Sequence, residues 1–277
     1  MKKKIVFFLA CTSSILAAES ATPSPQITPY LELCKQYPST LGPLGSWKKG
    51  EIEIILEPEL IAKIEKQARL RLEAAGYSEK DAANYSRVGI VGEDNYWIWL
   101  RDGVIFPSGV YGTYDRLLWK NALQGAEGVG VLLILKNKKI LINLAYRHAT
   151  RSWELELPRG QRSPQEKIEE AAKREMMEET GCTIERLTYL GEVAPDAGTI
   201  AVKLPIYLAT ASPSGDRHKE FSEAIPDNPS FTKERLKEGF AQGYLSYKIN
   251  GKTEKVCCRD ALLAYALFQA ENKGLLP

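Results

Sequence analysis

The chain has no surplus of either charge, few cysteines, and no apolar run long enough to cross a membrane. Its 37 Lys and Arg residues are balanced by 35 Asp and Glu residues, and the formal net charge is +2. This balance disfavours nucleic acid as the main partner, because such binders usually carry a basic patch. None of the 5 cysteines forms the Cys-x-x-Cys pair typical of thiolate metal sites. With 44% hydrophobic and 26% charged residues, the chain fits one substantial globular domain with appended elements.

The start of the chain differs from the rest in composition. Residues 1–4 are basic after the initiator Met, residues 5–18 are almost wholly apolar or small, and residues 19–23 are polar and turn-prone. This pattern predicts a secretory signal peptide over residues 1–21, and its apolar part is too short for a stable membrane span. We therefore expect export to the periplasm or the medium if the leader is cleaved, and a cytoplasmic protein otherwise. A buried N-terminal element is the alternative, and a lipidated Cys11 is a minor one.

After such cleavage four cysteines remain. Cys257 and Cys258 are adjacent and rarely pair with each other, because a disulfide needs a suitable Cα separation and torsion. One bridge between distant cysteines, which include Cys34 and Cys182, stays open.

The rest of the chain divides into three parts. Residues 22–56 are rich in Pro, Ser, Thr and Gly and are expected to form a linker with little regular structure. Residues 57–122 should hold an amphipathic helix followed by a β segment, and residues 123–277 the main domain. Strands are expected over 96–100, 104–106, 110–119, 128–135, 140–146, 153–157, 187–193 and 200–209 and in a hairpin over 244–257, and helices over 57–75, 232–240 and 260–272.

One helix in the main domain carries a regular set of carboxylates. Glu175, Glu178 and Glu179 stand at i, i+3 and i+4, and therefore share one helix face. Three like charges repel each other, but a hard cation such as Mg²⁺, which prefers oxygen ligands, would turn them into a site. Arg174 is four residues before Glu178 and can hold its carboxylate in place. The alternative is an exposed acidic helix without a ligand.

The ends of this helix are also indicated by the sequence. Ser163 as N-cap, Pro164 at the first helical position and Glu166 three residues after the cap form a capping box. Gly181 is expected to end the helix. The capping role can account for Glu166 by itself, so its role as a metal ligand stays open.

The whole stretch resembles the box of the Nudix hydrolase superfamily. Glu166 follows Gly160 after five residues, and the run from Arg174 to Cys182 follows after seven more. Cys182 takes the place of the usual Ile, Leu or Val, which should affect packing only. Tyr146-Arg147, residues 153–160 and the strand ending at 207–209 resemble the ADP-ribose pyrophosphatase branch.

The resemblance implies a fold, a partner and a reaction. The fold would be α+β, a Nudix-type α/β/α sandwich with a mixed sheet, preceded by a β-rich N-terminal segment and a helix that contact a second subunit in a homodimer. The reaction would be Mg²⁺- or Mn²⁺-dependent cleavage of the pyrophosphate of a nucleoside diphosphate derivative, with ADP-ribose giving AMP and ribose 5-phosphate as the leading case. Nucleotide sugars, dinucleoside polyphosphates and a non-catalytic nucleotide-binding module are the alternatives.

The resemblance also implies roles for particular residues. Glu175 and Glu179 would bind the metal, and Glu178 would bind it or hold the attacking water. The backbone carbonyl of Arg159 would be a further ligand. The loop at 195–202, where the branch often places the general base, has no acid near its end, and Asp196 is out of register. Glu220 and Glu223 in the later loop are the remaining candidates for the base, with solvated loop charge as the alternative.

Substrate contacts are expected from the segment before the box and from the β segment. Arg147 is the best candidate to clamp the second phosphate, and Arg151 is a weaker one. His148 is more often structural than catalytic. Trp97, with Tyr96 and Trp99, can stack on a nucleobase or pack in a core.

Overall fold

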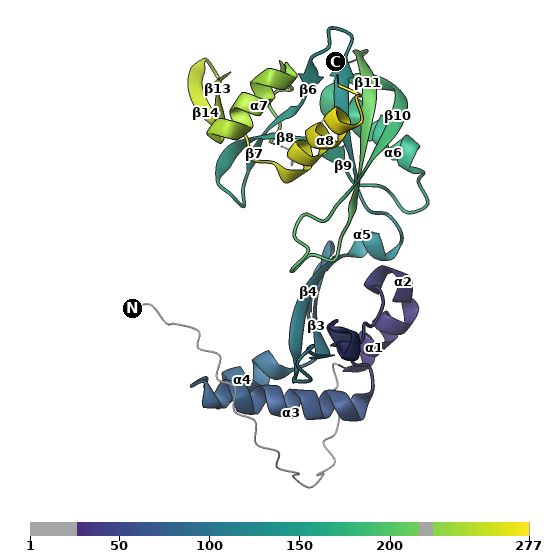
Figure 1. Cartoon of the computed structure of the whole chain (residues 1–277), viewed down its shortest axis with the longest axis vertical. Helices are drawn as coiled ribbons and strands as arrows, with labels where there is room; N and C mark the ends of the chain where they lie inside the picture. The colour runs from purple at the N-terminus through teal and green to yellow at the C-terminus, as the bar shows by residue number, and fades with distance from the viewer. Residues whose placement is uncertain (1–26, 216–223, 277) are drawn as a thin grey trace.

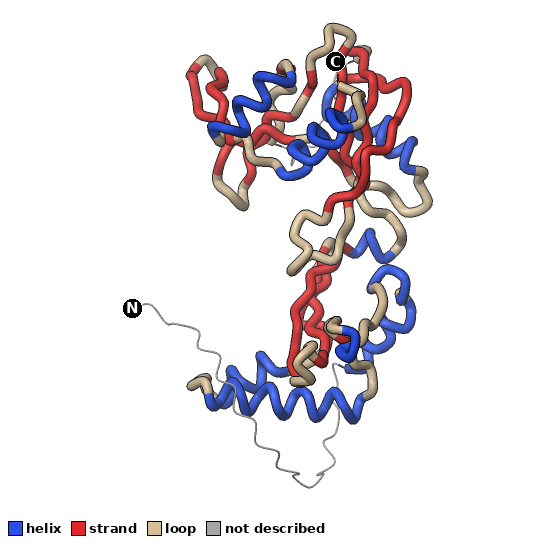
Figure 2. The backbone as a smooth tube through the Cα atoms, viewed as in Figure 1, coloured by secondary structure: helices blue, strands red, loops and turns tan. Residues whose placement is uncertain are grey.

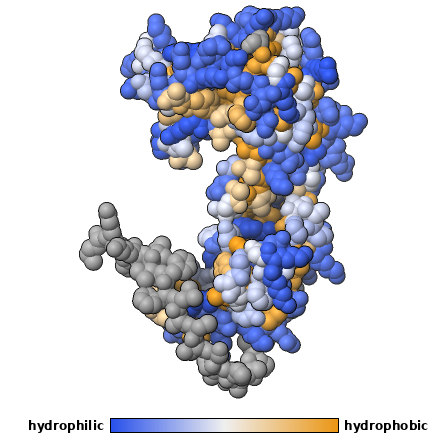
Figure 3. Space-filling model, in the orientation of Figure 1, coloured by the Kyte–Doolittle hydropathy of each residue, from blue (hydrophilic) through white to orange (hydrophobic). Residues whose placement is uncertain are grey.

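The computed structural model describes residues 27–215 and 224–276. The predicted leader and the two base candidates Glu220 and Glu223 lie outside these residues. Figure 1 shows two units along the long axis, an N-terminal unit (residues 27–123) and a C-terminal unit (residues 124–276). In the view of Figure 3, hydrophobic residues reach the surface at the narrow part between the units. Within the described ranges, no helix has both the length and the apolar character needed to cross a bilayer.

The predicted linker at 22–56 is wrong over its described part, because that segment is folded. It forms α1 (Ile27–Gln36), α2 (Pro38–Leu41), the 3-10 helix η1 (Trp47–Lys49) and the short strand β1 (Glu53–Ile54). Ile27, Tyr30 and Cys34 are buried, at the i, i+3 and i+7 positions of one face of α1. The composition of this segment did not indicate a helix, because Pro, Ser and Thr residues surround the short apolar face.

The rest of the N-terminal unit is a helical pair and an antiparallel sheet. The predicted helix is α3 (Pro58–Ala74), which begins at a proline, and α4 (Glu79–Ser86) follows unpredicted. The sheet contains β2 (Gly89–Glu93), β3 (Trp97–Ile105) and β4 (Tyr111–Trp119), with β3 paired to β1, β2 and β4. The two strands expected at 96–100 and 104–106 are one strand, β3.

Paired charges explain why β3 is continuous. Arg101 and Asp102 read as a polar interruption, yet both are buried within the strand. Arg101 Nε donates to Asp115 Oδ1 at 2.7 Å, and Arg116 Nε donates to Asp102 Oδ2 at 2.6 Å. Tyr30 Oη also donates to Asp102, at 2.7 Å, which fastens α1 to the sheet.

The C-terminal unit has two sheets and three main helices. One sheet has the order β10-β11-β5-β6-β12, with β9 beside β5, and the other the order β13-β14-β8-β7. The strand β11 is parallel to β5 and antiparallel to β10, so the sheet is mixed as expected. The elements are β5 (Val129–Leu135), β6 (Ile140–Leu141), β7 (Asn143–Arg147), β8 (Ser152–Glu156), β9 (Arg159–Gly160), α6 (Ile168–Thr180), β10 (Cys182–Val193), β11 (Leu204–Pro213), β12 (Ser230–Phe231), α7 (Lys233–Gln242), β13 (Tyr244–Ile249), β14 (Lys252–Cys257) and α8 (Ala261–Asn272).

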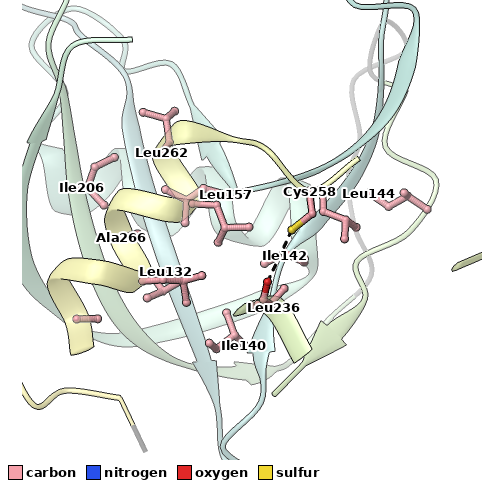
Figure 4. Packing of buried hydrophobic residues seen from close by; sticks show 14 of the residues in the cluster. Leu132, Ile140, Ile142, Leu144, Leu157, Ile206, Leu236, Cys258, Leu262 and Ala266 are labelled. Atoms are coloured by element: carbon pink, nitrogen blue, oxygen red, sulfur yellow. Dashed lines mark hydrogen bonds between the residues drawn. The ribbon is translucent and has the colours of Figure 1, made fainter. Parts of the chain in front are cut away.

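Alternation along β5 places helices on both faces of the central sheet. Val129 and Val131 pack with Met176 of α6 on one face. Leu132 packs on the other face with Ala266 of α8 (Figure 4). This arrangement confirms the predicted α/β/α sandwich. Cys182 is buried in the α6 cluster, which agrees with a packing role.

The two units are joined by backbone hydrogen bonds as well as by the connecting helix α5 (Lys120–Leu123). Leu117 of β4 donates its N–H to the Thr199 carbonyl at 2.8 Å and accepts the Ala201 N–H at 2.9 Å. The strand predicted at 200–209 therefore starts only at Leu204, because the residues before it pair with β4. In Figure 2 this loop reaches the end of the N-terminal strands.

Candidate active site

The helix α6 begins later than its sequence indicates. Ser163 and Pro164 do not start it, because Gln165 has a φ of +68°, a left-handed conformation that a helix cannot continue through. The Glu166 carboxylate still accepts the Ser163 N–H at 2.9 Å, as half of a capping box would, but this contact closes a turn before the helix. The helix starts at Ile168 and ends as predicted at Gly181, whose φ is +66°.

Arg174 lies at the centre of the acidic cluster. Its guanidinium donates to Glu166 at 3.0 Å, to Glu175 at 2.8 Å and to Glu178 at 3.0 Å. The last contact is the predicted i, i+4 pair. Hydrogen bonds to Glu166 and then Glu175 raise the pKa of Arg174 although burial acts against them, and the same contact with Arg174 lowers the pKa of Glu166. Arg174 thus offsets the repulsion between the carboxylates.

Glu175 is packed against the loop that precedes the helix. A Cβ atom added to Gly160 would lie 1.9 Å from Glu175 Cδ and 2.0 Å from Oε2. Glycine is therefore required at position 160 for the carboxylate to reach the loop backbone. This contact explains why a glycine and a glutamate are found at this spacing.

Glu179 is buried and is oriented by two donors. The Asn143 side-chain amide donates to Oε2 at 2.9 Å, and the Arg159 N–H donates to the same atom at 3.1 Å. Asn143 is in turn fixed by Asn228, which donates to its Oδ1 at 2.7 Å. Sequence reasoning missed Asn143, although an amide inside the apolar run 140–146 was a signal.

The donor set has the chemistry that a hard cation requires. Glu175, Glu178, Glu179 and the Arg159 backbone supply oxygen atoms of the type that Mg²⁺ and Mn²⁺ prefer. In residues 27–215 and 224–276, no group of three acidic, histidine or cysteine side chains is arranged to hold a metal ion. The carboxylates instead accept hydrogen bonds from Arg174 and Asn143. The Glu166 carboxylate is engaged by hydrogen bonds from Arg174 and from the Ser163 N–H. Its role as a direct metal ligand stays a prediction.

Arg147 lies beside the loop of the box. Its Nε donates to Glu156 Oε2 at 2.8 Å, and this hydrogen bond raises the pKa of Arg147 against the effect of burial. The Arg159 side chain joins Glu156 at 3.2 Å and Asp260 at 3.3 Å. Burial raises the pKa of Asp260, which Arg159 partly opposes. Sequence reasoning missed Glu156 and Asp260.

The other predicted substrate residues lie elsewhere. Arg151 is in the exposed turn between β7 and β8, where it contacts His148 at 2.8 Å and lies over the Tyr146 ring. Trp97 belongs to the N-terminal unit and stacks on Trp119 with ring centroids 5.5 Å apart. Tyr96 and Trp99 are exposed, so the alternative of core packing is wrong for them.

Comparison with known proteins agrees with this geometry. Residues 126–225 match the NUDIX domain family model. The crystal structure of an ADP compounds hydrolase is similar to this chain, with 22% sequence identity and a TM-score of 0.52 over 68% of this chain and 94% of that chain. No curated protein matches at a significant level.

Residues 126–225, within the C-terminal unit, therefore match a NUDIX domain. The predicted resemblance and the predicted fold are confirmed. The match to the NUDIX domain agrees with the predicted enzyme class, a hydrolase acting on pyrophosphate bonds.

Proposed function

We propose that the chain is a divalent-cation-dependent hydrolase that cleaves the pyrophosphate of a nucleoside diphosphate derivative, with ADP-ribose as its best substrate. The observation that carries the proposal is the face of α6, where Glu175 packs on Gly160 and Glu179 is held by Asn143 and the Arg159 backbone. The similarity to an ADP compounds hydrolase supports the choice of an adenosine diphosphate.

The residues of the site fit two tasks, which are holding a divalent cation and binding the phosphates of the substrate. Glu175, Glu178, Glu179 and the Arg159 carbonyl would hold Mg²⁺ or Mn²⁺, which when bound neutralises phosphate charge and lowers the pKa of water. Arg174 keeps the carboxylates in register before substrate arrives. Arg147, fixed by Glu156, offers its guanidinium to the second phosphate.

The bond changes are those of a hydrolysis. Water adds to one phosphorus, the bond from that phosphorus to the bridging oxygen breaks, and the bridging oxygen leaves with the other phosphate and the electron pair. The proton of the water passes to a general base, for which Glu223 and Glu220 are our proposals. ADP-ribose then gives AMP and ribose 5-phosphate.

The test is an assay of ADP-ribose with Mg²⁺ or Mn²⁺ in which the products are separated by ion-exchange chromatography. We expect Glu179→Gln to abolish turnover, with the matched change Glu238→Gln, at an exposed glutamate of α7, leaving turnover close to wild type. Full activity of the Glu179→Gln variant would contradict the assignment. The same assay with nucleotide sugars and dinucleoside polyphosphates separates the alternative substrates, and Glu223→Gln compared with Glu220→Gln separates the base candidates.

We also propose that two copies associate through the N-terminal unit and that the leader is removed on export. The side chains of Tyr96 and Trp99, where β3 begins, are exposed, and this supports the proposed association. Sedimentation equilibrium of the protein and of a Trp99→Ser variant tests association.

N-terminal sequencing of the protein from its source cells tests removal of the leader, and an intact Met1 would rule out cleavage.

A further inference from the structure

The polar face of β7 and β8 continues the site beyond the glutamates of α6. The register places Asn143 opposite Glu156, Ala145 opposite Glu154 and Arg147 opposite Ser152. Side chains alternate along strands, so these residues share one face, whereas Leu144 and Leu155 point into the core. Since Asn143 contacts Glu179, this face leads directly away from the acidic cluster.

Two buried carboxylates on β8 hold arginines at this face. The side chains of Glu154 and Glu156 are each only 7% exposed. Burying a carboxylate is costly unless it is well paired, and both are. Glu156 binds Arg147 and Arg159, and Glu154 binds Arg259 together with the hydroxyl groups of Ser152 and Thr150.

The geometry of Arg259 suits an anion. Its Nη2 donates to Glu154 Oε1 at 2.6 Å and to Ser152 Oγ at 3.1 Å, and its Nε donates to Glu154 Oε2 at 3.3 Å. Its side chain is nevertheless 56% exposed, and its Nη1 makes no hydrogen bond to the described part of the chain. A guanidinium fixed on one edge and open to solvent on the other is preorganised to bind a phosphate.

The carboxylates of Glu154 and Glu156 lie beneath the guanidinium groups. This face therefore presents hydrogen-bond donors to a ligand. Asp260, which follows Arg259, accepts the Leu157 N–H at 2.9 Å and ties this position to the loop of the box. Glu154 is two residues from Glu156, or about 7 Å along an extended strand. Since Arg147 donates to Glu156 and Arg259 donates to Glu154, the guanidinium of Arg259 is held one step farther along β8 from the Asn143–Glu156 pair than that of Arg147.

We propose that Arg259, held by Glu154 and Ser152, is a specificity-determining residue that binds an additional phosphate on one half of the substrate. The inference rests on the proposed function and narrows it to nucleoside diphosphate derivatives that are phosphorylated beyond the pyrophosphate. Arg147 serves the pyrophosphate, and Arg259 serves the phosphate beyond it.

The test compares ADP-ribose with two derivatives, one phosphorylated on the terminal ribose and the other on the ribose of adenosine. Binding is measured by calorimetry with a chelator present, so that no turnover occurs, and kcat and KM are measured with Mg²⁺. We expect wild type to bind one derivative about 10- to 100-fold more tightly than ADP-ribose, and Arg259→Gln to remove that preference while binding ADP-ribose as before. Arg235→Gln is the matched control, since Arg235 is also an exposed arginine paired to a glutamate, but its partner Glu238 is itself exposed.

The outcomes separate this inference from the proposed function. Equal binding of all three compounds by wild type, or a preference that survives in Arg259→Gln, would overturn the inference. A loss of affinity for all three compounds would assign Arg259 a structural role and also overturn it. If Arg259→Gln does not fold, Arg259→Lys, which keeps the charge but not the two-edged geometry, must lose most of the preference. Absence of any turnover with Mg²⁺ would count against the proposed function alone, because the binding preference is measured without it.

Discussion

At the scale of residues, Glu179 shows how a buried carboxylate is kept in one orientation. It is 5% exposed and accepts from a side-chain amide and a backbone N–H, both on the same oxygen. Asn143 is 36 positions away in sequence, and Asn228 behind it is 85 positions farther along. Spacing within one helix predicted Glu179, but it could not predict partners at such separations.

Replacing Asn143 should reduce activity through Glu179. Asn143→Leu keeps the size of the side chain but removes the donor to Oε2. We expect kcat/KM to fall about 10- to 100-fold, the usual cost of losing a residue that orients a metal ligand, which is the role we propose for Glu179. Mn²⁺ affinity, followed by electron paramagnetic resonance, should weaken in parallel. Asn137→Ala, in an exposed turn, is the control, and wild-type Mn²⁺ affinity in Asn143→Leu would refute the orienting role.

At the scale of elements, the sequence predicted those whose signals are local. The helices α3, α7 and α8 follow from their apolar spacing, and the β13–β14 hairpin follows from Asn250 and Gly251, which both have positive φ. The sequence predicted the start of α6 too early, because the capping pattern forms a turn at Gln165 and not the first turn of the helix. The role of β8 could not be predicted, since Arg259, which pairs with the buried Glu154, is 105 positions away.

The contact between β9 and α6 gives a prediction that separates activity from stability. Gly160→Ala places a methyl group on the Glu175 carboxylate, which is the end of a flexible side chain and can move. We expect little change in melting temperature but a fall in kcat of about 100-fold, because displacing a catalytic group by about 1 Å has that effect, and we propose such a role for Glu175. Gly92→Ala, where nothing lies within 4 Å of the new atom, is the control. Equal kcat in the two variants would show that Glu175 need not touch this loop.

The strand β8 gives a prediction for the dependence of stability on pH. Burial acts to raise the pKa of Glu154, but hydrogen bonds from Arg259, Ser152 and Thr150 outweigh it, and the folded pKa is below the usual value. The stabilisation is therefore complete above the unfolded pKa of about 4.3 and is lost as the pH falls through the lower folded value. Urea unfolding at pH values between about 6 and 3 should show a gap between wild type and Glu154→Gln that closes at the acidic end. A gap that stays constant with pH would contradict this account.

At the scale of the whole molecule, a short backbone pairing joins the two units. The residues at 199–201 belong to the C-terminal unit in sequence, yet they pair with β4 of the N-terminal unit. Ala201 also packs in the N-terminal core. This pairing couples the units, so they should unfold together.

Breaking the pairing should uncouple them. Ala201→Pro removes the N–H that donates to Leu117, and we expect the single unfolding transition to divide in two. Four of the 5 tryptophans, at positions 47, 97, 99 and 119, are in the N-terminal unit. Fluorescence should therefore report that unit, and circular dichroism the whole chain. Ala201→Gly, which keeps the N–H, is the control, and coincident curves for Ala201→Pro would show that α5 alone couples the units.

The backbone pairing between the units also limits how the protein can be recombined. A chimera that joins this N-terminal unit to the core of another protein would leave Leu117, at the outer edge of β4, without its backbone partners. Unpaired strand edges are templates for aggregation. Residues 196–203 would have to be transplanted together with the N-terminal unit, although they lie more than 70 positions after it in the chain.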